Sequence, residues 1–494
     1  MPNGYRGIFK STALIGGSAF ISGFIRMAQN KVVAVLLGAD GVALLATMTD
    51  LFNVVSNGSA LGLQSSSVRQ IAEAAGAEDH VKLSQTVIVY RRAVWATGLL
   101  GALILLLGAK GLSQTTFGSG RYVWAIAALA PLAVVTQLSA GQCAVLQGMR
   151  QISRLSLIRI FSALGGFLLV IPCYYLWGMQ GVVPGMLAAA VVNLLVSWWH
   201  VRKIAIQKLR VSWQTSLSVL RPMLALGLSF AAGILIASLL CYLQKILLIR
   251  FSDLESCGYY QAGVGASGIL VGFILAAMGT DYYPKLAGLL HNPRGLQQAV
   301  REQMEISLFL SVPGLVAMMI FAPMILHMLY SAAFVKAAIL MQIFTFAVYF
   351  QVVSWPLGYV VMAHGHGGIY LVTQLVSAAI QLVLFYAGLR LWGVPGCAAA
   401  GVMGYFVYVA IMVFLLYWNY GVRLGWPLSL TIMAGCLLMG LVFVNLRATS
   451  APVFRWGGNL AILLGVSAGC GVLLMRNLNL TMAEIKQRLL RERG

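Results

Sequence analysis

Three basic side chains lie inside long apolar stretches of this sequence, where a charge must be paired or must face water. Arg26 and Lys31 interrupt the apolar residues 14–38, and Lys245 lies within residues 222–249. A charged side chain at the centre of a bilayer costs about 2.5–3.5 kcal/mol on insertion scales, so such residues usually face a protein interior or a water-filled cavity. The three cations therefore predict a polar path that attracts anions.

A row of polar side chains follows the first apolar stretch at helical spacing. Asp50, Asn53 and Asn57 share one face of a helix. About a hairpin near residue 40, Lys31 and Asp50 lie at equal depth, whereas Arg26 is level with the two asparagines and with no carboxylate. Two interpretations stay open: the face is a wall of a substrate cavity, or Lys31 and Asp50 form a structural ion pair while the amides bond between helices.

Lys245 is the most informative of the three cations. The same depth in the following apolar stretch, near Gly265, holds no carboxylate, and Asp253 and Glu255 lie nearer the outer loop. A cation without a partner inside a helix bundle needs water or an anionic ligand. We therefore expect Lys245 to contact the substrate, with snorkelling to the outer interface as the alternative.

No metal site and no cofactor are expected. The seven cysteines stand singly, without a C-x-x-C pair, and are interpreted as small core residues. His364 and His366 belong to a short glycine-rich turn, HGHGG, which predicts a solvated loop. The sequence holds no Walker nucleotide-binding loop, so any driving force is expected to come from an ion gradient or the membrane potential.

Composition predicts a protein that crosses a membrane many times. Of the 494 residues, 60% are hydrophobic and 9% are charged, and the mean hydropathy is +0.88, outside the range of soluble domains. A run of about 20 apolar residues can cross a bilayer. Fourteen spans are predicted, at residues 12–38, 42–66, 86–109, 122–147, 156–178, 180–200, 222–249, 257–281, 305–329, 336–362, 368–392, 394–418, 427–446 and 456–475.

The strong positive charge follows from topology. The 33 Lys and Arg residues outnumber the 12 Asp and Glu residues, which gives a net charge of +21. With both termini in the cytoplasm, 23 of the cations fall in inner segments, 7 in outer segments and 3 within spans, as the positive-inside rule requires. Basic inner loops suit membrane lipids, and no nucleic-acid binding is expected.

The two halves of the chain resemble one another weakly. FISGFIRMAQNKVVAVLLGADG aligns with ILIASLLCYLQKILLIRFSDLESCG so that Lys31 meets Lys245, and such internal repeats are typical of secondary transporters. The expected fold class is an all-α polytopic membrane protein made of two parallel six-helix bundles and a C-terminal helix pair. The expected domains are residues 1–212, residues 213–420, and residues 421–494 with the additional two helices and a basic cytoplasmic tail.

Three blocks carry a resemblance to a known family: LLGADG, GYYQAGVGASGILVGFILAAMGTDYYPKLAGLL and GYVVMAHGHGGIYLVTQLVSAAIQL. With the two six-span halves, they resemble an O-antigen translocase of the polysaccharide transporter family, within the multidrug/oligosaccharidyl-lipid/polysaccharide exporter superfamily. The resemblance implies a flippase that moves undecaprenyl-pyrophosphate-linked oligosaccharide from the cytoplasmic to the periplasmic leaflet of a bacterial inner membrane. It also implies a role in O-antigen and lipopolysaccharide synthesis beside a polysaccharide polymerase.

Four more residues are candidates for contact with such a substrate. Gln374 belongs to a polar stripe that suits sugar hydroxyls, although such stripes also pack helices together. Arg150, Arg154 and Arg159 lie where the span 156–178 begins on the cytoplasmic side, in reach of a lipid pyrophosphate. Ordinary anchoring of a membrane helix explains these arginines about as well.

Two other functions are compatible with parts of the sequence. A drug or metabolite antiporter of the same superfamily, coupled to H+ or Na+, would use an intramembrane carboxylate, and Asp50 is the deeply placed acid here. A membrane-embedded polysaccharide polymerase or ligase would need a sizeable outer loop for its catalytic residues, which the predicted spans leave no room for. We therefore expect a transporter and not an enzyme.

Overall fold

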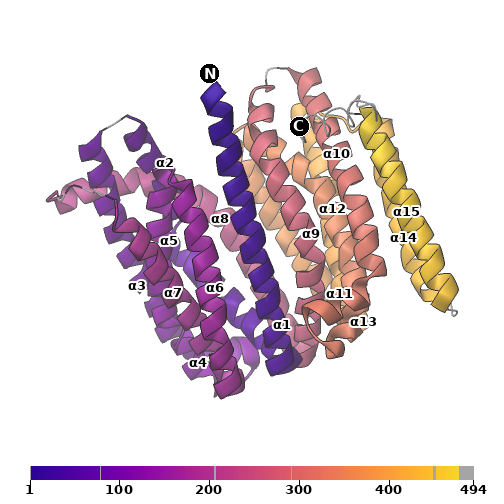
Figure 1. Ribbon diagram of the computed structural model, residues 1–494, viewed down its shortest axis with the longest axis horizontal. Coiled ribbons are helices and arrows are strands. Elements are labelled where there is room, and N and C mark those ends of the chain that lie inside the picture. The colour runs from indigo at the N-terminus through magenta and orange to yellow at the C-terminus, as the bar shows by residue number, and fades with distance from the viewer. Residues whose placement is uncertain are drawn as a thin grey trace, which may run out of the picture. The chain divides into compact units, whose positions relative to one another are not determined.

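The computed structural model describes residues 2–77, 79–204, 207, 209–290, 292–448 and 452–477, and none of these residues forms a β-strand. The predicted basic tail lies outside them. Contacts divide the chain into a first compact unit, Met1–Gln261 with Leu329–Ser331, and a second, Ala262–Met328 with Ala332–Gly494. Each unit is a bundle of long helices (Figure 1).

The first unit holds the helices up to the beginning of α9. They are α1 (Pro2–Ala60), α2 (Leu63–Gly76), α3 (His80–Phe117), η1 (Gly120–Tyr122), α4 (Val123–Ala127), α5 (Ala130–Gly148), α6 (Ile152–Trp177), η2 (Gly178–Gly181), α7 (Val182–Val201), α8 (Trp213–Phe251) and the first residues of α9 (Leu254–Ala287).

The second unit holds most of α9 and the helices that follow. They are α10 (Pro293–Ile320), α11 (Ala322–Leu329), η3 (Ala332–Ala337), α12 (Ala338–Ala363), α13 (Gly367–Tyr420), α14 (Trp426–Ala448) and α15 (Pro452–Asn477).

The all-helical, polytopic fold class is confirmed. Ten described segments are long and apolar enough to cross a membrane. Three of them contain 45, 50 and 54 residues, namely 16–60, 152–201 and 367–420, whereas one crossing needs about 20 residues. Each of these three is interrupted where the sequence predicts a hairpin between two spans.

The three interruptions share one turn. Gly38, Gly178 and Gly393 have φ of 67°, 53° and 64° with ψ of −163°, −130° and −145°. A side chain is scarcely tolerated in this region of backbone space. The second and third turns also share the pattern Leu-Trp-Gly-x-x-Gly. The turns at Gly178 and Gly393, one in each unit, therefore correspond to each other, which supports the internal repeat.

Small and apolar side chains form the core of each unit. In the first unit, Ile71, Val87, Tyr90, Ala144 and Met223 join α2, α3, α5 and α8. In the second unit, one large apolar cluster joins α10, α12, α13 and α14. Many large apolar side chains on the outside of the helices stay exposed, as expected of surfaces that face lipid.

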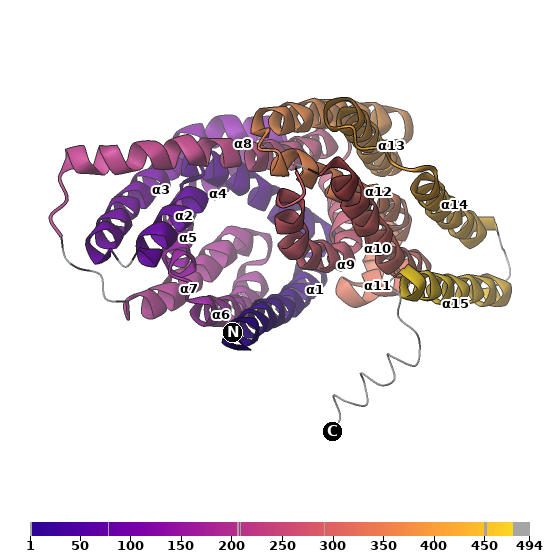
Figure 2. The ribbon, with the colours of Figure 1, turned by 90° about the horizontal axis from the view of Figure 1, so that it is seen from above.

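Helix α8 packs in the first unit, although it follows the predicted domain boundary at residues 212 and 213. Its neighbours there are α1, α2 and α3, and Figure 2 shows it running along α2 and α3. The predicted boundary was based on the sequence repeat, and that division stays a prediction.

The C-terminal helix pair packs in the second unit. Helices α14 and α15 both contact α10, and α14 also contacts α12. Tyr349 of α12 donates a hydrogen bond of 2.6 Å to the carbonyl of Ile432 in α14. Asn445 and Asn459 join α14 to α15 through a hydrogen bond of 3.0 Å. Amide bonds between helices stabilise pairs in an apolar surrounding.

Candidate transport site

A contact between α1 and α8 contains three of the polar residues singled out in the sequence, namely Asp50, Asn57 and Lys245. We call it the α1–α8 seam: residues 46–62 at the end of α1 against residues 227–245 of α8. Asn57 donates a hydrogen bond of 3.0 Å from Nδ2 to Oγ of Ser238. Further along, the ammonium of Lys245 pairs with the carboxylate of Asp50.

The spacing of these pairs shows that the two helices run antiparallel in one register. Asp50 and Asn57 are seven residues apart, and so are Ser238 and Lys245. Seven residues make about two helical turns, which returns a side chain to the same face. Two polar pairs therefore lie on one stripe between α1 and α8.

Glycine closes the end of the seam at Gly62. The turn after α1 places Leu61 at φ 50° and Gly62 at φ 67°. A side chain added at Gly62 would overlap the carbonyl of Gly227 in α8. The two backbones therefore touch at this point, which only glycine permits.

The prediction that Lys245 has no carboxylate partner is wrong. Its side chain is 7% exposed and that of Asp50 is 17% exposed, and the two form an ion pair. Lys245 also donates to the carbonyl of Ala46 at 3.4 Å. The partner, Asp50, lies 195 residues earlier in the chain and not in the next predicted span. The carboxylate offsets the cost of burying the ammonium.

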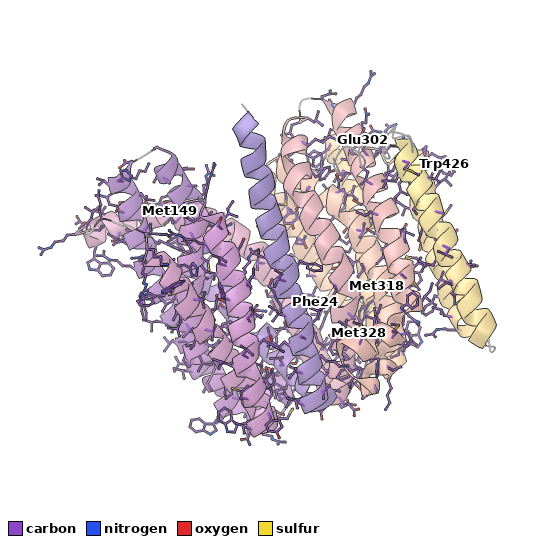
Figure 3. The ribbon with its side chains drawn as sticks, in the orientation of Figure 1. Phe24, Met149, Glu302, Met318, Met328 and Trp426 are labelled. Atoms are coloured by element: carbon purple, nitrogen blue, oxygen red, sulfur yellow. The ribbon has the colours of Figure 1, made fainter. Side chains whose placement is uncertain are left out.

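The four other candidates on α1 differ in exposure. Arg26 is exposed, two residues after the exposed Phe24 (Figure 3). Lys31 and Asn53 are half-buried. Asn57 is half-buried and is engaged with Ser238. A role of these residues in binding substrate stays a prediction, with Arg26 the most accessible of them.

Gln374 packs within α13. Its side-chain Nε2 donates a hydrogen bond of 3.3 Å to the hydroxyl of Tyr408, on the other side of the turn at Gly393. This contact matches the alternative in which polar stripes join neighbouring helices. Binding of sugar hydroxyls by the same residue stays a prediction.

The three arginines at the expected cytoplasmic side are mostly exposed. Arg150 and Arg159 are exposed, and Arg154 is half-buried, with a long hydrogen bond of 3.5 Å to the carbonyl of His200. Arg150 lies between α5 and α6 at φ 55°, a conformation that side chains other than Asn and Asp adopt rarely. Recruitment of a lipid anion by these arginines stays a prediction.

Contacts from α8 to α3 were not predicted. The hydroxyls of Tyr242 and Thr116 hydrogen-bond to each other. Arg250 donates to the carbonyls of Gln114 and Thr115, the latter at 2.9 Å. These carbonyls belong to the last turn of α3, where a cation is favourable. Nothing in the local sequence around Arg250 indicates that it caps a helix 135 residues earlier.

Near its start, α8 is tied to α3 by another arginine. Arg92 donates to Oγ of Ser216 at 2.8 Å and to the carbonyl of Val211 at 3.0 Å. Its guanidinium also stacks over the ring of Trp213, 5.2 Å from the ring centre. Together with the contacts of Tyr242 and Arg250, this holds both ends of α8 against α3.

A second unpredicted network joins α5, α6 and α7. Asn193 accepts a hydrogen bond of 3.0 Å from Ser162 and donates one of 3.2 Å to Ser139. Ser197 donates to Gln142 at 2.5 Å. Each of these residues is a polar side chain within an otherwise apolar span, which is the signal that would have indicated them.

The histidines of the HGHGG turn contact neighbouring helices. His364 Nδ1 lies 2.8 Å from the carbonyl of Val360, and His366 Nδ1 lies 2.7 Å from the hydroxyl of Tyr420. Within the part of the chain that the structure describes, no three His, Cys, Asp or Glu residues are grouped as a metal site would need.

Three acids gather at the turn after Gly38. Partial burial raises the pKa of the Asp40 carboxyl above its usual value, and the negative charges of Glu255 and Asp253 raise it further. Glu255 also accepts a hydrogen bond of 2.7 Å from the hydroxyl of Tyr259. The turn between the first two predicted spans therefore carries a carboxylate in an unfavourable electrostatic position.

Comparison with known proteins agrees with the resemblance seen in the sequence. Residues 32–339 match the family described as "Polysaccharide biosynthesis protein", more than half of the chain. No curated protein sequence matches.

Solved structures share the fold at low sequence identity. The lipid II flippase MurJ, in an inward closed conformation, has a TM-score of 0.68 at 12% identity, covering 93% of this chain and 98% of MurJ. An inward-facing multidrug resistance MATE family transporter of the MOP superfamily has a TM-score of 0.68 at 15% identity, covering 87% and 96%. An outward-facing MATE transporter has a TM-score of 0.59 at 16% identity, covering 86% and 96%. The chain therefore belongs to this family of polysaccharide biosynthesis proteins and has the all-helical fold of the MOP superfamily.

Proposed function

We propose that the protein is a flippase for an anionic, lipid-linked oligosaccharide. The observation that carries the proposal is a pair of cations, Arg26 and Lys245, within apolar helices of a chain from a polysaccharide biosynthesis family. Cations inside a membrane protein mark paths for anions. The expected substrate is an undecaprenyl-pyrophosphate-linked oligosaccharide, such as an O-antigen unit, moved from the cytoplasmic to the periplasmic leaflet.

The side chains suit a diphosphate with attached sugars. Arg26 is exposed on α1 and presents a planar guanidinium, which binds phosphate oxygens through paired hydrogen bonds. Lys245 supplies a second cation when it is released from Asp50. Amides such as Asn53 provide both donors and acceptors for sugar hydroxyls. Arg150, Arg154 and Arg159 would attract the lipid at the cytoplasmic surface.

Transport would proceed by alternating access without a nucleotide. An inside-negative potential favours outward movement of an anion by about 2.3 kcal/mol per charge per 100 mV. A gradient of H+ or Na+ is the second source of energy under this proposal. A polysaccharide polymerase on the periplasmic side is the expected consumer of the product, because repeating units must be joined after they cross.

A second candidate function is export of drugs or metabolites coupled to a cation. The fold shared with MATE transporters and the membrane-embedded carboxylate of Asp50 favour it. The carboxylate is neutralised by Lys245 in the structure, whereas coupling to a cation needs it to be released. The flippase is the stronger proposal because the family match is to polysaccharide biosynthesis.

The location under this proposal is a bacterial inner membrane with both termini in the cytoplasm. A cysteine placed at Lys336, which lies in an expected outer segment, should react with a membrane-impermeant maleimide added outside the cell. A cysteine at Arg69, in an expected inner segment, should react only after the membrane is opened. The reverse pattern would overturn the topology.

The function is tested in cells that lack the chain. Loss of the protein should deplete surface polysaccharide and trap the lipid-linked unit in the cytoplasmic leaflet, where an added periplasmic glycosidase cannot reach it. Restoring the chain should return the unit to the glycosidase. Normal surface polysaccharide with increased sensitivity to organic cations would instead assign the protein to drug export.

A further inference from the structure

A cluster of aromatic and polar side chains in the second unit carries no charge. We call it the α12–α13 cluster, and its six members are Gln351, Trp355 and Tyr359 of α12 with Tyr370, Gln374 and Tyr408 of α13. We propose that this cluster binds the neutral saccharide of the transported lipid and so determines which oligosaccharide is accepted. The inference rests on the proposed flippase function and adds a site for the sugars to the cations proposed for the diphosphate.

Helix α12 presents its part of the cluster on one sheltered face. Gln351, Trp355 and Tyr359 follow one another at intervals of four residues, which places them on one side of the helix. All three are half-buried, and none of residues 338–361 of α12 is exposed. Surfaces that face lipid carry exposed apolar side chains, such as Val372 of α13. The partly accessible face of α12 therefore does not face lipid.

One hydroxyl group joins this face to both halves of α13. The hydroxyl of Tyr408 accepts a hydrogen bond of 3.3 Å from Nε2 of Gln374. The same hydroxyl lies 3.8 Å from the position that a Cβ at Gly358 would take, next to Tyr359 in the chain. Tyr370 lies one helical turn before Gln374 and shares its side of the helix. The cluster therefore draws on α12 and on both halves of α13.

The aromatic rings of α12 are held by contacts within the unit. The ring centre of Tyr359 lies 5.4 Å from that of Trp355 at an interplanar angle of 84°, and 6.0 Å from that of Tyr282 at 90°. Tyr282 is buried and donates a hydrogen bond of 3.3 Å to the carbonyl of Pro356. Edge-to-face contacts of this kind orient aromatic rings. Side chains that are already oriented lose little conformational entropy when a ligand binds.

This combination of groups matches the chemistry of a saccharide. The C–H bonds on one face of a sugar ring are weakly positive, and they pack on the negative face of an aromatic ring. Phenol and amide groups both donate and accept hydrogen bonds, so they suit sugar hydroxyls, which do the same. A glutamine amide has two N–H donors and an oxygen acceptor, and the bond from Gln374 to Tyr408 uses one of the donors.

The lack of charge separates the cluster from a site for a diphosphate. Between residues 338 and 420 the sequence holds one residue of the types Asp, Glu, Lys and Arg, namely Arg390. Arg390 follows Gln374 by 16 residues, which is about 24 Å along a helix, and its guanidinium contacts Tyr386. A diphosphate would find no cation within the cluster, and an organic cation would find no carboxylate. Neutral sugars are therefore the ligands that the cluster suits.

Oxidative footprinting tests the binding of sugars without any transport. The probe is the free oligosaccharide that mild acid releases from the lipid-linked unit of the same cells, added to the purified protein in lipid nanodiscs. Hydroxyl radicals oxidise accessible aromatic side chains, and mass spectrometry measures the oxidation of each residue. We expect the oxidation of Trp355 and Tyr370 to fall about threefold, because a bound sugar covers its site. The exposed Trp418 of α13 should not change.

Substitutions test whether the cluster determines the choice of sugar. In vesicles, Trp355→Leu should slow the movement of the lipid that bears the complete oligosaccharide about tenfold, which corresponds to the loss of one aromatic contact. Trp355→Phe keeps a ring and should recover part of the rate. A lipid diphosphate that bears a single sugar should move at nearly the same rate in all these proteins. The control is Phe350→Leu, a half-buried side chain on α12 outside the cluster, which should leave both rates nearly unchanged.

Two results would overturn the inference. One is a footprint in which the oligosaccharide protects neither Trp355 nor Tyr370, or in which tetraphenylphosphonium, an organic cation, protects them in its place. The other is an equal loss of movement for the long and the short lipid in Trp355→Leu. If the unmodified protein moves neither lipid, the proposed flippase function fails, and the footprint still decides whether the cluster binds sugars.

Discussion

Asp50 and Lys245 form an ion pair between α1 and α8, although 195 residues separate them in the chain. Their side chains are 17% and 7% exposed. The pair joins the one deeply placed acid of the sequence to the cation that the sequence predicted to be unpaired. Lys245 can therefore bind another anion only after it is released from Asp50.

The ion pair should show strong coupling in a double-mutant cycle. Asp50→Ala leaves the buried ammonium without its carboxylate, and removal of one partner of a buried pair costs about 3–5 kcal/mol. Adding Lys245→Ala should recover much of this loss. The stability of the three variants is measured from their unfolding in detergent, which is monitored by tryptophan fluorescence. Equal and additive losses would contradict the pairing.

An exposed ion pair provides the matched control for that cycle. Arg69 and Glu73 are paired at 2.8 Å, with side chains 67% and 57% exposed. Surface pairs contribute about 0–1 kcal/mol. Glu73→Ala should therefore change the stability far less than Asp50→Ala, and a similar loss in both would show that burial is not what makes the Asp50 pair important.

Arg26 should be needed for transport and not for folding. Its side chain is exposed, so Arg26→Ala should leave the protein level and the unfolding temperature unchanged while surface polysaccharide falls. Arg26→Lys keeps the charge and should retain part of the function. The rest should be lost, because an ammonium lacks the bidentate geometry of the guanidinium. Wild-type polysaccharide in Arg26→Ala cells would remove this residue from the site.

The hairpin turns should require glycine. Gly178 and Gly393 have positive φ with open space around them, so Ala at either position meets backbone strain and no steric clash. Such conformations cost side-chain-bearing residues about 1–3 kcal/mol. The control is Gly465→Ala, within α15 and also in open space, which should be neutral or stabilising. Equal effects at all three sites would contradict the shared turn.

The turn at Asp40 should make stability depend on pH. The pKa of this carboxyl is raised by burial and by its acidic neighbours, so the folded state binds the proton more tightly than the unfolded state. Stability from this group is present at low pH and is lost as the pH rises above the usual carboxyl pKa. Asp40→Asn should therefore stabilise the protein at neutral pH and have little effect near pH 3. A benefit independent of pH would contradict this assignment.

Much of the fold could be predicted because apolar runs and glycine turns are local signals. The helix breaks at Gly38 and Gly178 fall on the last residue of a predicted span, and the break at Gly393 falls between two predicted spans. The partner of Lys245 could not be predicted in the same way. Comparing depths on consecutive spans finds hairpin neighbours, whereas α1 and α8 are brought together only by the packing of the bundle.

Polar residues within the predicted spans indicate where polar contacts occur. They do not indicate whether the contact is with a neighbouring helix or with a ligand. Gln374 hydrogen-bonds to Tyr408, as expected of a residue that joins helices, and Asn57 hydrogen-bonds to Ser238. A helical stripe of amides looks the same in sequence whether it faces a neighbouring helix or a ligand. The exposure of Arg26, in contrast, is a property of the assembled bundle and separates it from the paired residues.

The most direct test of the proposed flippase is movement of a labelled lipid in vesicles that contain the purified chain. The lipid carries a diphosphate-linked oligosaccharide and starts in the inner leaflet, and its arrival in the outer leaflet is measured with a membrane-impermeant quencher added outside. We predict that the protein moves this lipid and that an outside-positive potential accelerates the movement. A lipid with the same sugars and no phosphate should not be moved. A rate equal to that of vesicles without protein, together with accumulation of an organic cation, would contradict the proposal.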